Sequence, residues 1–530
     1  MRQQRGNPWA VLIVVSLGFF MTLLDLTIVN IAIPNMIDKL HASLDDVLWV
    51  INAYALVLAV LLITAGRLGD LLGQRTVFFG GVALFTVASV ACGLAPSPGW
   101  LIAFRAVQGL GAAALMPQTL AILTMVFPAE RRGAAFGIWG AVAGVATVAG
   151  PTLGGLLVTA FDWRYIFFIN LPVGVIVLVL TLMLIPDLRT GRKHSFDILG
   201  TVLASAALLA ICYALVEGQE YNWGTITGII SIPLLFAVGA VLLVAFIWVQ
   251  ARRQQGEPLV PFSLFRDRNY ALMNVVSCFI AIGMLGIFLP LSIYLQDVLG
   301  FSALKAGLTL APASVVAMFV APVAGRMTDR IGGKFILMTG LALFAGGMGA
   351  IVLIAQTNSA WYDFLAPQFV AGIGIGCTFA PLTTVAMRNI NPMMAGAASG
   401  VFNTTRQVGT VIGTAGVGAL LQNRLIAGFT SQIHQRAANL PVAAQHAILA
   451  KFQAAAKSGL AGGPTQHSSP LEVQIFAHGF VEGMRPTMTV PIVFLFGAAA
   501  VCLLIKRKSR TQEGLPAEAT SHEAPAAAAG

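Results

Sequence analysis

Two charged residues interrupt the apolar segments of the N-terminal region: an acid, which can bind and release a proton, and an arginine, which stays charged. Asp25 lies about two-thirds along the apolar segment 9–31, and Arg105 separates the uncharged segments 76–104 and 106–129. An ionised carboxylate at that depth of a bilayer costs roughly 2.5–3.5 kcal/mol on insertion scales. Burial disfavours the charged form and a neighbouring cation favours it, so conformation or substrate can switch its protonation. We predict that Asp25 couples proton movement; the alternative is a static ion pair or a helix-end group.

Arg105 has the complementary charge. A buried guanidinium stays protonated, so it must meet a carboxylate, a carbonyl oxygen or water. Gln108 follows one helical turn later, on the same helix face. We predict Arg105 as the second proton-coupling residue; the alternative is an anchor for helix packing.

Several other polar or aromatic residues within apolar segments could line a substrate cavity. Arg406 lies near Asn403 in the segment 395–421, with no Asp or Glu beside it. For most of these residues, ordinary packing is the alternative interpretation. The predicted substrate-lining residues are Asn30, Trp49, Asn52, Tyr54, Gln108, Met116, Gln118, Asn403 and Arg406.

Motifs for other energy sources and for catalysis are missing from the sequence. It contains no G-x-x-x-x-G-K-[ST] run to hold ATP phosphates. It contains no metal-ligand spacing and no nucleophile–base motif, and its five cysteines all lie in apolar runs. We therefore expect no enzymatic activity, no metal site and no cofactor, with a proton gradient as the source of energy.

The composition determines which kind of element must position these residues. Apolar residues make up 57% of the 530 residues and charged residues only 10%, against about 25% charged in an average soluble chain. Such a chain could not cover a soluble surface, which excludes a soluble enzyme, a nucleic-acid binder and a disordered scaffold. Since lipid cannot satisfy open backbone groups, each apolar segment is predicted to be a membrane-spanning helix.

Fourteen such segments can be counted, which predicts an all-α polytopic membrane protein. Most of the 31 Lys and Arg residues fall on one side if the N-terminus is cytoplasmic, and both termini then lie in the cytoplasm. The predicted parts are a cytoplasmic N-terminus (1–8), a six-helix bundle (9–186), a linker with two inserted helices (187–250), a cytoplasmic linker (251–269), a second six-helix bundle (270–506) with a long outer loop (422–486), and a disordered cytoplasmic tail (507–530).

An internal repeat supports this division. The run Gly66–Arg75 is repeated as Gly325–Lys334 at an offset of 259 residues, and Gly109–Gly111 is repeated as Gly372–Gly374 at an offset of 263. The second offset places Gln368 opposite Arg105, so the charge is not duplicated. Two six-helix repeats are typical of transporters with the substrate site between the halves.

The repeated run is also a candidate conformational latch. Gly66, Asp70, Gly73 and Arg75 lie at a predicted helix end, and Asp329 repeats the acid in the second half. Asp70 can accept hydrogen bonds from the N-terminus of a neighbouring helix, and such contacts can form in one state and break in another. Basic residues alone could be a topology signal, which does not explain the repeated acid.

A second motif, Gly150-Pro151-Thr-Leu-Gly154-Gly155, combines close helix approach with a bend. Its glycines allow another helix to come near, and Pro151 removes one backbone hydrogen bond. We predict a place where the two halves hinge or seal; ordinary membrane-helix packing is the alternative.

Over about residues 8–506, the sequence resembles the major facilitator superfamily, and within it the fourteen-span drug:proton antiporters. The Gly66–Arg75 run resembles the family's cytoplasmic loop motif, and Leu24–Pro34 resembles its first-span motif. Arg105–Gly111 resembles the fourth-span motif, and Gly150–Gly155 resembles the antiporter motif of the fifth span. The resemblance implies a functional acid at Asp25, an arginine linked to proton transfer, and export. Some relatives carry acids in span 13 for divalent cations, and this sequence departs from that pattern.

The expected function is therefore multidrug efflux, with antibiotic resistance as its consequence. The sequence predicts a proton-coupled antiporter that exports amphipathic or cationic small molecules by alternating access. Its expected partners are small-molecule substrates, protons and the lipid bilayer of the cell (inner) membrane, with no nucleic acid, and the expected oligomeric state is a monomer. Export of a lipid or an endogenous metabolite is the alternative, followed by a non-transporting sensor or channel.

Overall fold

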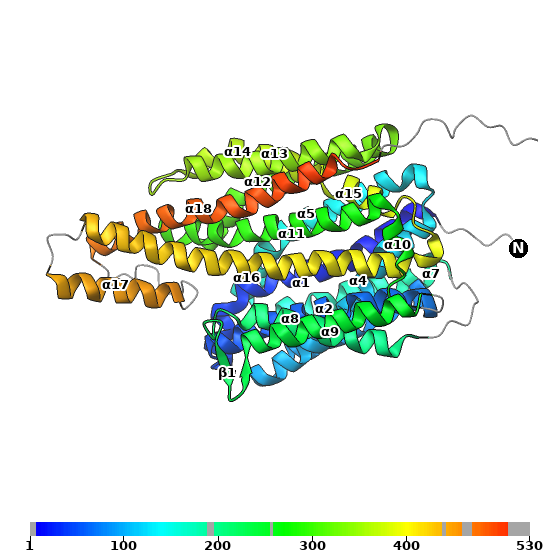
Figure 1. Ribbon diagram of the computed structural model, residues 1–530, viewed down its shortest axis with the longest axis horizontal. Coiled ribbons are helices and arrows are strands. Elements are labelled where there is room, and N and C mark those ends of the chain that lie inside the picture. Colours follow the sequence, from blue (N-terminus) through cyan, green and yellow to red (C-terminus); the bar gives the residue numbers. More distant parts are fainter. Residues whose placement is uncertain (1–6, 188–195, 255–257, 437–440, 458–468, 507–530) are drawn as a thin grey trace, which may run out of the picture.

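Helices make up nearly all of the computed structural model, which describes residues 7–187, 196–254, 258–436, 441–457 and 469–506. The helices run largely along one axis and form a bundle (Figure 1). One short hairpin, β1 (Thr225–Thr227) and β2 (Ile230–Ser231), is antiparallel.

The first six-helix half comes from the N-terminal third of the chain. A 3-10 turn, η1, precedes α5, and the short α6 leads into α7 as one apolar segment. Its elements are α1 (Pro8–Leu40), α2 (Leu44–Leu72), α3 (Gln74–Gly93), α4 (Pro98–Val126), η1 (Ala129–Arg131), α5 (Arg132–Ala160), α6 (Tyr165–Phe168) and α7 (Asn170–Leu184).

The second half repeats this order after the insertion and a short connecting helix, α10 (Ser263–Arg266). Its elements are α11 (Arg268–Ile293) with its π-helical end η2 (Tyr294–Val298), α12 (Ala303–Ile331), α13 (Gly333–Ile354), η3 (Trp361–Phe364), α14 (Leu365–Gly376), α15 (Phe379–Met387), η4 (Pro392–Met394), α16 (Ala395–Arg436), α17 (Val442–Lys457) and α18 (Pro470–Cys502).

The turns between helices confirm the repeat. α2 ends at Gly73 with φ 93°, and α12 ends at Gly332 with φ 89°. L-residues with a side chain rarely adopt this backbone conformation, so glycine is needed at both corners. The same tight turn therefore leads into the third helix of each half.

Twelve segments of the described chain are long and apolar enough to cross a membrane. The twelve include all predicted spans except those of α5 and α16, which are helices of 29 and 42 residues packed within the same bundle. The all-α polytopic fold is therefore confirmed, while the count of fourteen spans stays a prediction.

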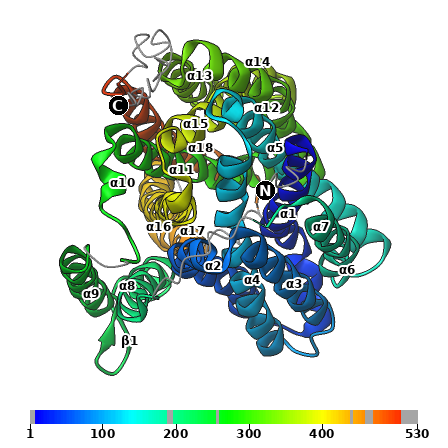
Figure 2. The same ribbon diagram turned by 90° about the vertical axis from the view of Figure 1, so that its right-hand side faces the viewer.

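The inserted helices α8 (Ile198–Glu217) and α9 (Ile232–Arg252) stand beside the bundle rather than inside it (Figure 2). α8 packs against both halves, because its Cys212 joins Leu56 and Val60 of α2 and Val411 of α16 in one apolar cluster. α9 exposes an apolar surface that includes Val241. The insertion thus covers the line where α2 of the first half meets α16 of the second.

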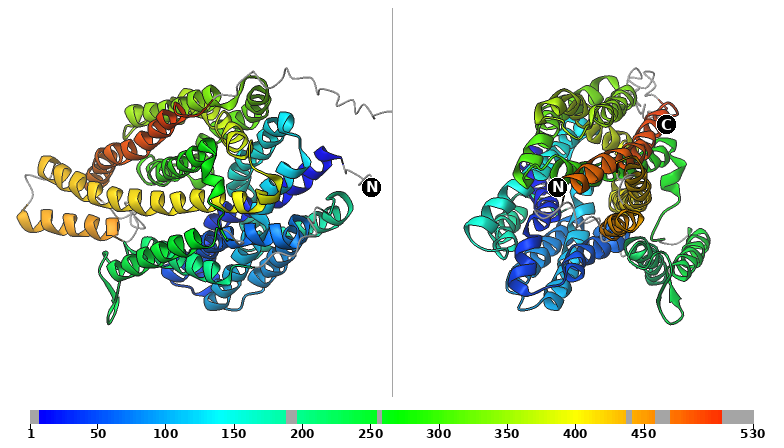
Figure 3. Two further views of the ribbon diagram at one scale, coloured as in Figure 1. Left: turned by 45° about the vertical axis from the view of Figure 1, so that its right-hand side comes forward. Right: turned by 90° about the vertical axis from the view of Figure 1, so that its left-hand side faces the viewer.

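The predicted long outer loop over residues 422–486 is helical at both of its ends, and the helix expected around Ala443–Lys457 within it is present as α17 (Val442–Lys457). α16 continues to Arg436, and α18 already begins at Pro470, capped by Ser469 and Glu472. With α17 these helix ends project from the bundle (Figures 1 and 3). Phe429 holds them together, since its ring centroid lies 5.1 Å from that of Phe452 and 5.6 Å from that of Phe476. The predicted tail 507–530 lies outside the described residues.

Candidate functional site

The two residues predicted to couple protons are in direct contact. The Asp25 carboxylate of α1 forms an ion pair with Arg105 of α4, and its Oδ1 accepts a hydrogen bond from Gln108 Nε2 at 2.9 Å. Arg105 Nη1 also donates to Gln108 Oε1 at 2.8 Å. None of these three residues has any exposed surface. We call Asp25, Arg105 and Gln108 the charged network.

Backbone and aromatic groups complete the surroundings of the guanidinium. Arg105 Nε donates to the carbonyl oxygen of Val50 at 3.0 Å, and the centre of the Tyr54 ring lies 4.3 Å from the guanidinium carbon. Cys92 Sγ donates to Gln108 Oε1 at 3.6 Å. Because α1, α2, α3 and α4 supply all of these groups, the charged network lies inside the first half and not between the halves.

Two residues that were predicted to line the substrate cavity, Tyr54 and Gln108, contact Arg105 and Asp25 of the charged network. Tyr54 is fully buried and is a ring partner of Arg105, and Gln108 is a hydrogen-bond partner of Asp25. The three-residue spacing of Arg105 and Gln108 indicated their shared face. The sequence analysis named Tyr54 as a cavity-lining residue, but no signal indicated its contact with Arg105, because that contact depends on how α2 packs against α4.

The other predicted lining residues of the first half are dispersed. Gln118 Nε2 donates to the Ala65 carbonyl at 2.8 Å and so ties α4 to α2. Met116 is buried in the main apolar core, and Asn30 is exposed with its amide bonded to its own helix. The ring of Trp49 lies 5.8 Å from that of Tyr213 in the inserted α8, and Asn52 is half-buried.

Asn403 and Arg406 form part of a polar stripe on α16. Arg406 Nη2 donates to Asn403 Oδ1 at 3.1 Å, and Asn403 Nδ2 donates to the Ser399 carbonyl at 2.9 Å. Ser399 Oγ in turn donates to the Pro117 carbonyl of α4 at 2.6 Å. The stripe therefore begins at a contact between the two halves.

The predicted latch acid Asp70 caps a helix of the opposite half. Its Oδ1 and Oδ2 accept hydrogen bonds from the backbone N–H groups of Gly396 and Ala397, both at 2.8 Å, at the start of α16. Free N–H groups and the helix dipole make a helix N-terminus a favourable place for a carboxylate. Gln74 Nε2 also donates to Oδ1, at 3.1 Å.

Asp329 makes the reciprocal contact. It lies near the end of α12 in the second half, and its carboxylate accepts from the N–H groups of Gly133 and Ala134 at 2.7 and 2.9 Å, at the start of α5. Each half therefore supplies one carboxylate and one helix N-terminus to the other. We call the end of the bundle that carries Asp70 and Asp329 the latch end.

Two basic residues near the latch end make different kinds of contact, one within its own half and one across to the other half. Arg75 Nη2 donates to the carbonyl of Leu182 at 2.7 Å, so this contact lies within the first half and does not cross to the second. The prediction that Arg75 joins Asp70 in holding the halves together is wrong in this state. Arg132, which was not among the predicted site residues, does connect the two halves. Its Nη1 donates to the Met387 carbonyl of the second half at 3.1 Å.

Glycine allows the close approach at the latch end. A Cβ atom added at Gly66 would overlap the carbonyl oxygen of Gly396, and one added at Gly325 would overlap that of Gly133. The four residues form two pairs of crossing helices, α2 with α16 and α12 with α5. The repeated glycines are therefore needed for closure at this end.

We expect Gly66→Val to open the latch end. Overpacking costs typically about 1–3 kcal/mol, which would reduce the closed population about five- to a hundred-fold. Distances between spin labels at the exposed positions Leu72 and Met393 should shift to longer values. Gly80→Val is the matched control, because a Cβ atom there meets nothing within 4 Å. An unchanged distance distribution would show that α2 and α16 can separate without this contact or tolerate the added bulk.

The Gly150 motif was predicted to lie where the two halves hinge or seal, but Gly150 packs within its own half. A Cβ atom at Gly150 would overlap Thr27 of α1, so the close contact lies within the first half, and one at Gly155 meets nothing within 4 Å. The glycines of α5 that face the second half are Gly133, Gly137, Gly140 and Gly144. The sequence identified close packing correctly, but this part of α5 does not seal the halves against each other. Gly154 is buried, and α5 runs through Pro151 as one helix.

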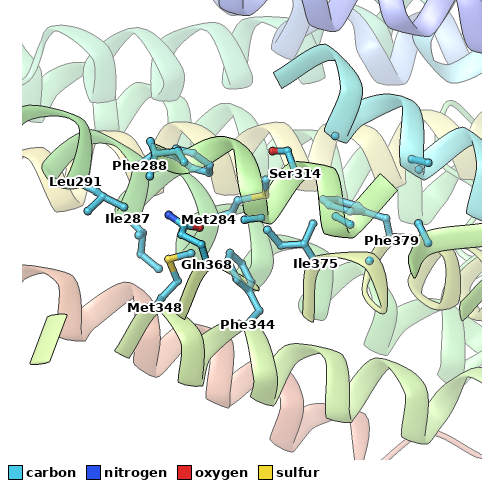
Figure 4. Close-up of a pocket in the computed structure, with 18 residues that line it drawn as sticks. Met284, Ile287, Phe288, Leu291, Ser314, Phe344, Met348, Gln368, Ile375 and Phe379 are labelled. Carbon is cyan, nitrogen blue, oxygen red and sulfur yellow. The ribbon is translucent and has the colours of Figure 1, made fainter. Parts of the chain in front are cut away.

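An apolar pocket lies between α5 and the second half. Its cavity volume is about 60 Å³, and the wider space of about 780 Å³ around its lining atoms includes open solvent. Figure 4 shows Gln368 among methionine and aromatic side chains. The lining residues come from α5, α11, α12, α13, α14 and α15, and none of them is charged.

Two repeated helical halves, reciprocal carboxylate caps and an ion pair inside the first half define a membrane carrier. The model of the major facilitator superfamily matches residues 15–414. The multidrug resistance protein Stp of Mycobacterium tuberculosis is 36% identical over 497 residues, 92% of this chain and 90% of that protein. The tetracenomycin C resistance and export protein of Streptomyces glaucescens is 36% identical over 523 residues, covering 97% and 94%.

A solved structure has the same fold. The human organic anion transporter MFSD10 aligns with a TM-score of 0.56 and 15% identity, over 92% of this chain and 99% of that one. The match to the family model and the identity with these relatives show that the chain belongs to the major facilitator superfamily. It is a transporter of the multi-pass membrane class and not an enzyme, and its relatives are antibiotic and multidrug resistance proteins.

Proposed function

We propose that this chain is a proton-coupled antiporter that exports amphipathic small molecules, cations among them, across the cell membrane by alternating access. The observation that carries the proposal is the buried contact of Asp25 with Arg105. Asp25 can take up a proton from one side and release it to the other, while Arg105 keeps its charge throughout. Moving one proton down 100 mV provides about 2.3 kcal/mol, enough for a roughly fifty-fold substrate gradient.

The distribution of basic residues supports an orientation with the latch end in the cytoplasm. Arg67, Arg75, Arg131 and Arg330 all lie near that end, as expected for cytoplasmic loops. In this orientation both termini are cytoplasmic, and the described state is closed toward the cytoplasm. Release of the Asp70 and Asp329 contacts would then admit substrate from inside the cell.

Export of a self-made metabolite is the second candidate. It is favoured by the names of two relatives, the tetracenomycin C resistance and export protein and the probable actinorhodin transporter of Streptomyces coelicolor. Both candidates use the same carrier cycle and differ in the source of the substrate.

Proton release from the purified protein in liposomes tests the coupling. A pH dye in the medium should report protons when a substrate displaces them from Asp25, and the parent protein should respond to several unrelated amphipathic drugs. The control is protein saturated with substrate before the addition. A response to one compound class alone would favour the metabolite exporter, and a flat response to every compound would contradict proton-coupled drug export.

A further inference from the structure

The apolar pocket in the second half occupies the place that corresponds to the charged network in the first half. The glycine contacts establish this correspondence. A Cβ atom at Gly109 of α4 would meet the backbone of Tyr54, and one at Gly372 of α14 would meet that of Ala313. Tyr54 and Ala313 are therefore equivalent positions, as the repeat offset of 259 residues also indicates.

A second pair of contacts extends the match. A Cβ atom at Gly111 would meet the backbone of Phe85, and one at Gly374 would meet that of Phe344. Since α4 and α14 match at an offset of 263 residues, Arg105 corresponds to Gln368. Both Phe344 and Gln368 line the pocket.

Two residue differences distinguish the pocket in the second half from the corresponding place in the first half. In the first half, the Tyr54 ring covers the Arg105 guanidinium at 4.3 Å. In the second half, the ring is replaced by the methyl group of Ala313 and the guanidinium by the shorter amide of Gln368. The second half therefore has smaller groups at the two positions that the ring and the guanidinium fill in the first half.

Gln368 brings an amide into this apolar space. Its exposed fraction is 2%, and it lines the pocket together with one other polar residue, Ser314. A hydrogen bond from a ligand would favour this amide, because burying an amide without a hydrogen bond costs about 1–3 kcal/mol in mutational data. Figure 4 shows the amide lying between Ile287 and Met348, inside the pocket.

We infer that this pocket binds an uncharged aromatic part of the exported molecule, with the Gln368 amide hydrogen-bonded to a carbonyl or hydroxyl group on that ring system. The inference rests on the proposed function and names the substrate chemistry. Phe288, Phe344 and Phe379 offer ring contacts, and Met284 and Met348 are adaptable thioethers that favour contact with aromatic faces. No lining residue could neutralise a charge, so a charged group of the same substrate must lie outside the pocket.

The two halves of the repeat would then have different tasks. The first half keeps the titratable group, and the second half keeps the substrate contact. α5 joins them, because its Gly144 lies at the pocket wall, where a Cβ atom would come within 3.3 Å of the Ser314 carbonyl of α12. The same two helices meet at the latch end through Asp329 and Gly133, so separation of α5 from α12 would open the pocket wall.

Binding of Nile red, an uncharged aromatic dye with a carbonyl group, tests the inference on the purified full-length protein. Fluorescence titration should give a three- to ten-fold weaker affinity in Gln368→Leu, as expected for one neutral hydrogen bond. Ala313→Phe returns an aromatic ring to the position of Tyr54 and should weaken binding more than ten-fold. Ala103→Phe, at an exposed position of α4, is the matched control and should bind as the parent does.

The outcomes separate this inference from the proposed function. Parental affinity in a monodisperse Ala313→Phe protein would overturn the pocket assignment, even if proton release persists. If Ala313→Phe does not fold, parental affinity in Gln368→Leu overturns it. Weakened dye binding in the two variants, with a parent protein that binds the dye and releases no protons, would support the pocket and contradict the proton coupling.

Discussion

Asp25→Asn should abolish uphill transport while the protein still inserts and folds. The carboxamide cannot titrate over the physiological range, so the carrier loses the group that exchanges protons in the proposed cycle. The substrate gradient supported by one proton, about fifty-fold at 100 mV, should fall to none. The measurement is drug accumulation in inverted vesicles or proteoliposomes under an imposed pH gradient.

Two controls separate coupling from folding in this prediction. Asp46→Asn removes a carboxylate that only caps α2 through Ser43, so it should retain coupled transport at a stability cost of about 1 kcal/mol. Asp25→Glu keeps a titratable group and should restore part of the gradient. Full drug resistance in cells that carry Asp25→Asn would show that another group carries the proton.

Removing a latch contact should strongly shift the equilibrium between the forms that are closed and open at the latch end. Asp70→Asn replaces an acceptor of two backbone hydrogen bonds by an amide with a single oxygen. Losing one such contact costs about 1–3 kcal/mol, which shifts the equilibrium about five- to a hundred-fold toward the form that is open at the latch end. Asp329→Asn should shift it in the same direction, and the two effects should add because the contacts lie at different helix pairs.

Thiol accessibility measures this shift. The five native cysteines are removed first, and single cysteines are placed at the latch ends of α4 and α14–α15 and at their opposite ends. Those at the latch end should react faster with a polar reagent in Asp70→Asn, and those at the opposite end should react more slowly. Arg75→Gln is the control, since among the described residues Arg75 donates its hydrogen bond to Leu182 of its own half. Equal reactivity in all variants, with transport intact, would mean that Asp70 serves topology or folding.

The sequence predicted the latch better than any other part of the site. The same acid stands in both copies of the repeat, and a topology signal made of basic residues does not require it. Backbone N–H groups at a helix start are available in any sequence, so the partner type could be foreseen. Arg75 was wrongly included because its spacing places it near Asp70 but does not show which half its side chain reaches.

Other features depended on packing that no local pattern encodes. The helical spacing of Arg105 and Gln108 indicated one face, while the position of Tyr54 over the guanidinium follows from how α2 crosses α4. Glycine at position 150 predicted close approach but not the identity of the approaching helix. Hydropathy alone ends the predicted span at residue 421, because Arg424 and its polar neighbours resemble a loop. The helix α16 continues to Arg436.

The length of α16 has a mechanical consequence. At 1.5 Å per residue, its 42 residues extend for about 63 Å, roughly twice the thickness of the hydrocarbon core. One end is pinned by Asp70, and the other is clamped to α17 and α18 through Phe429. A tilt of about 10° around the pinned end would carry the far end through roughly 11 Å. α16 is thus a lever that turns about the latch end, so a small tilt at the carboxylate becomes a displacement of roughly 11 Å at the end that packs against α17 and α18.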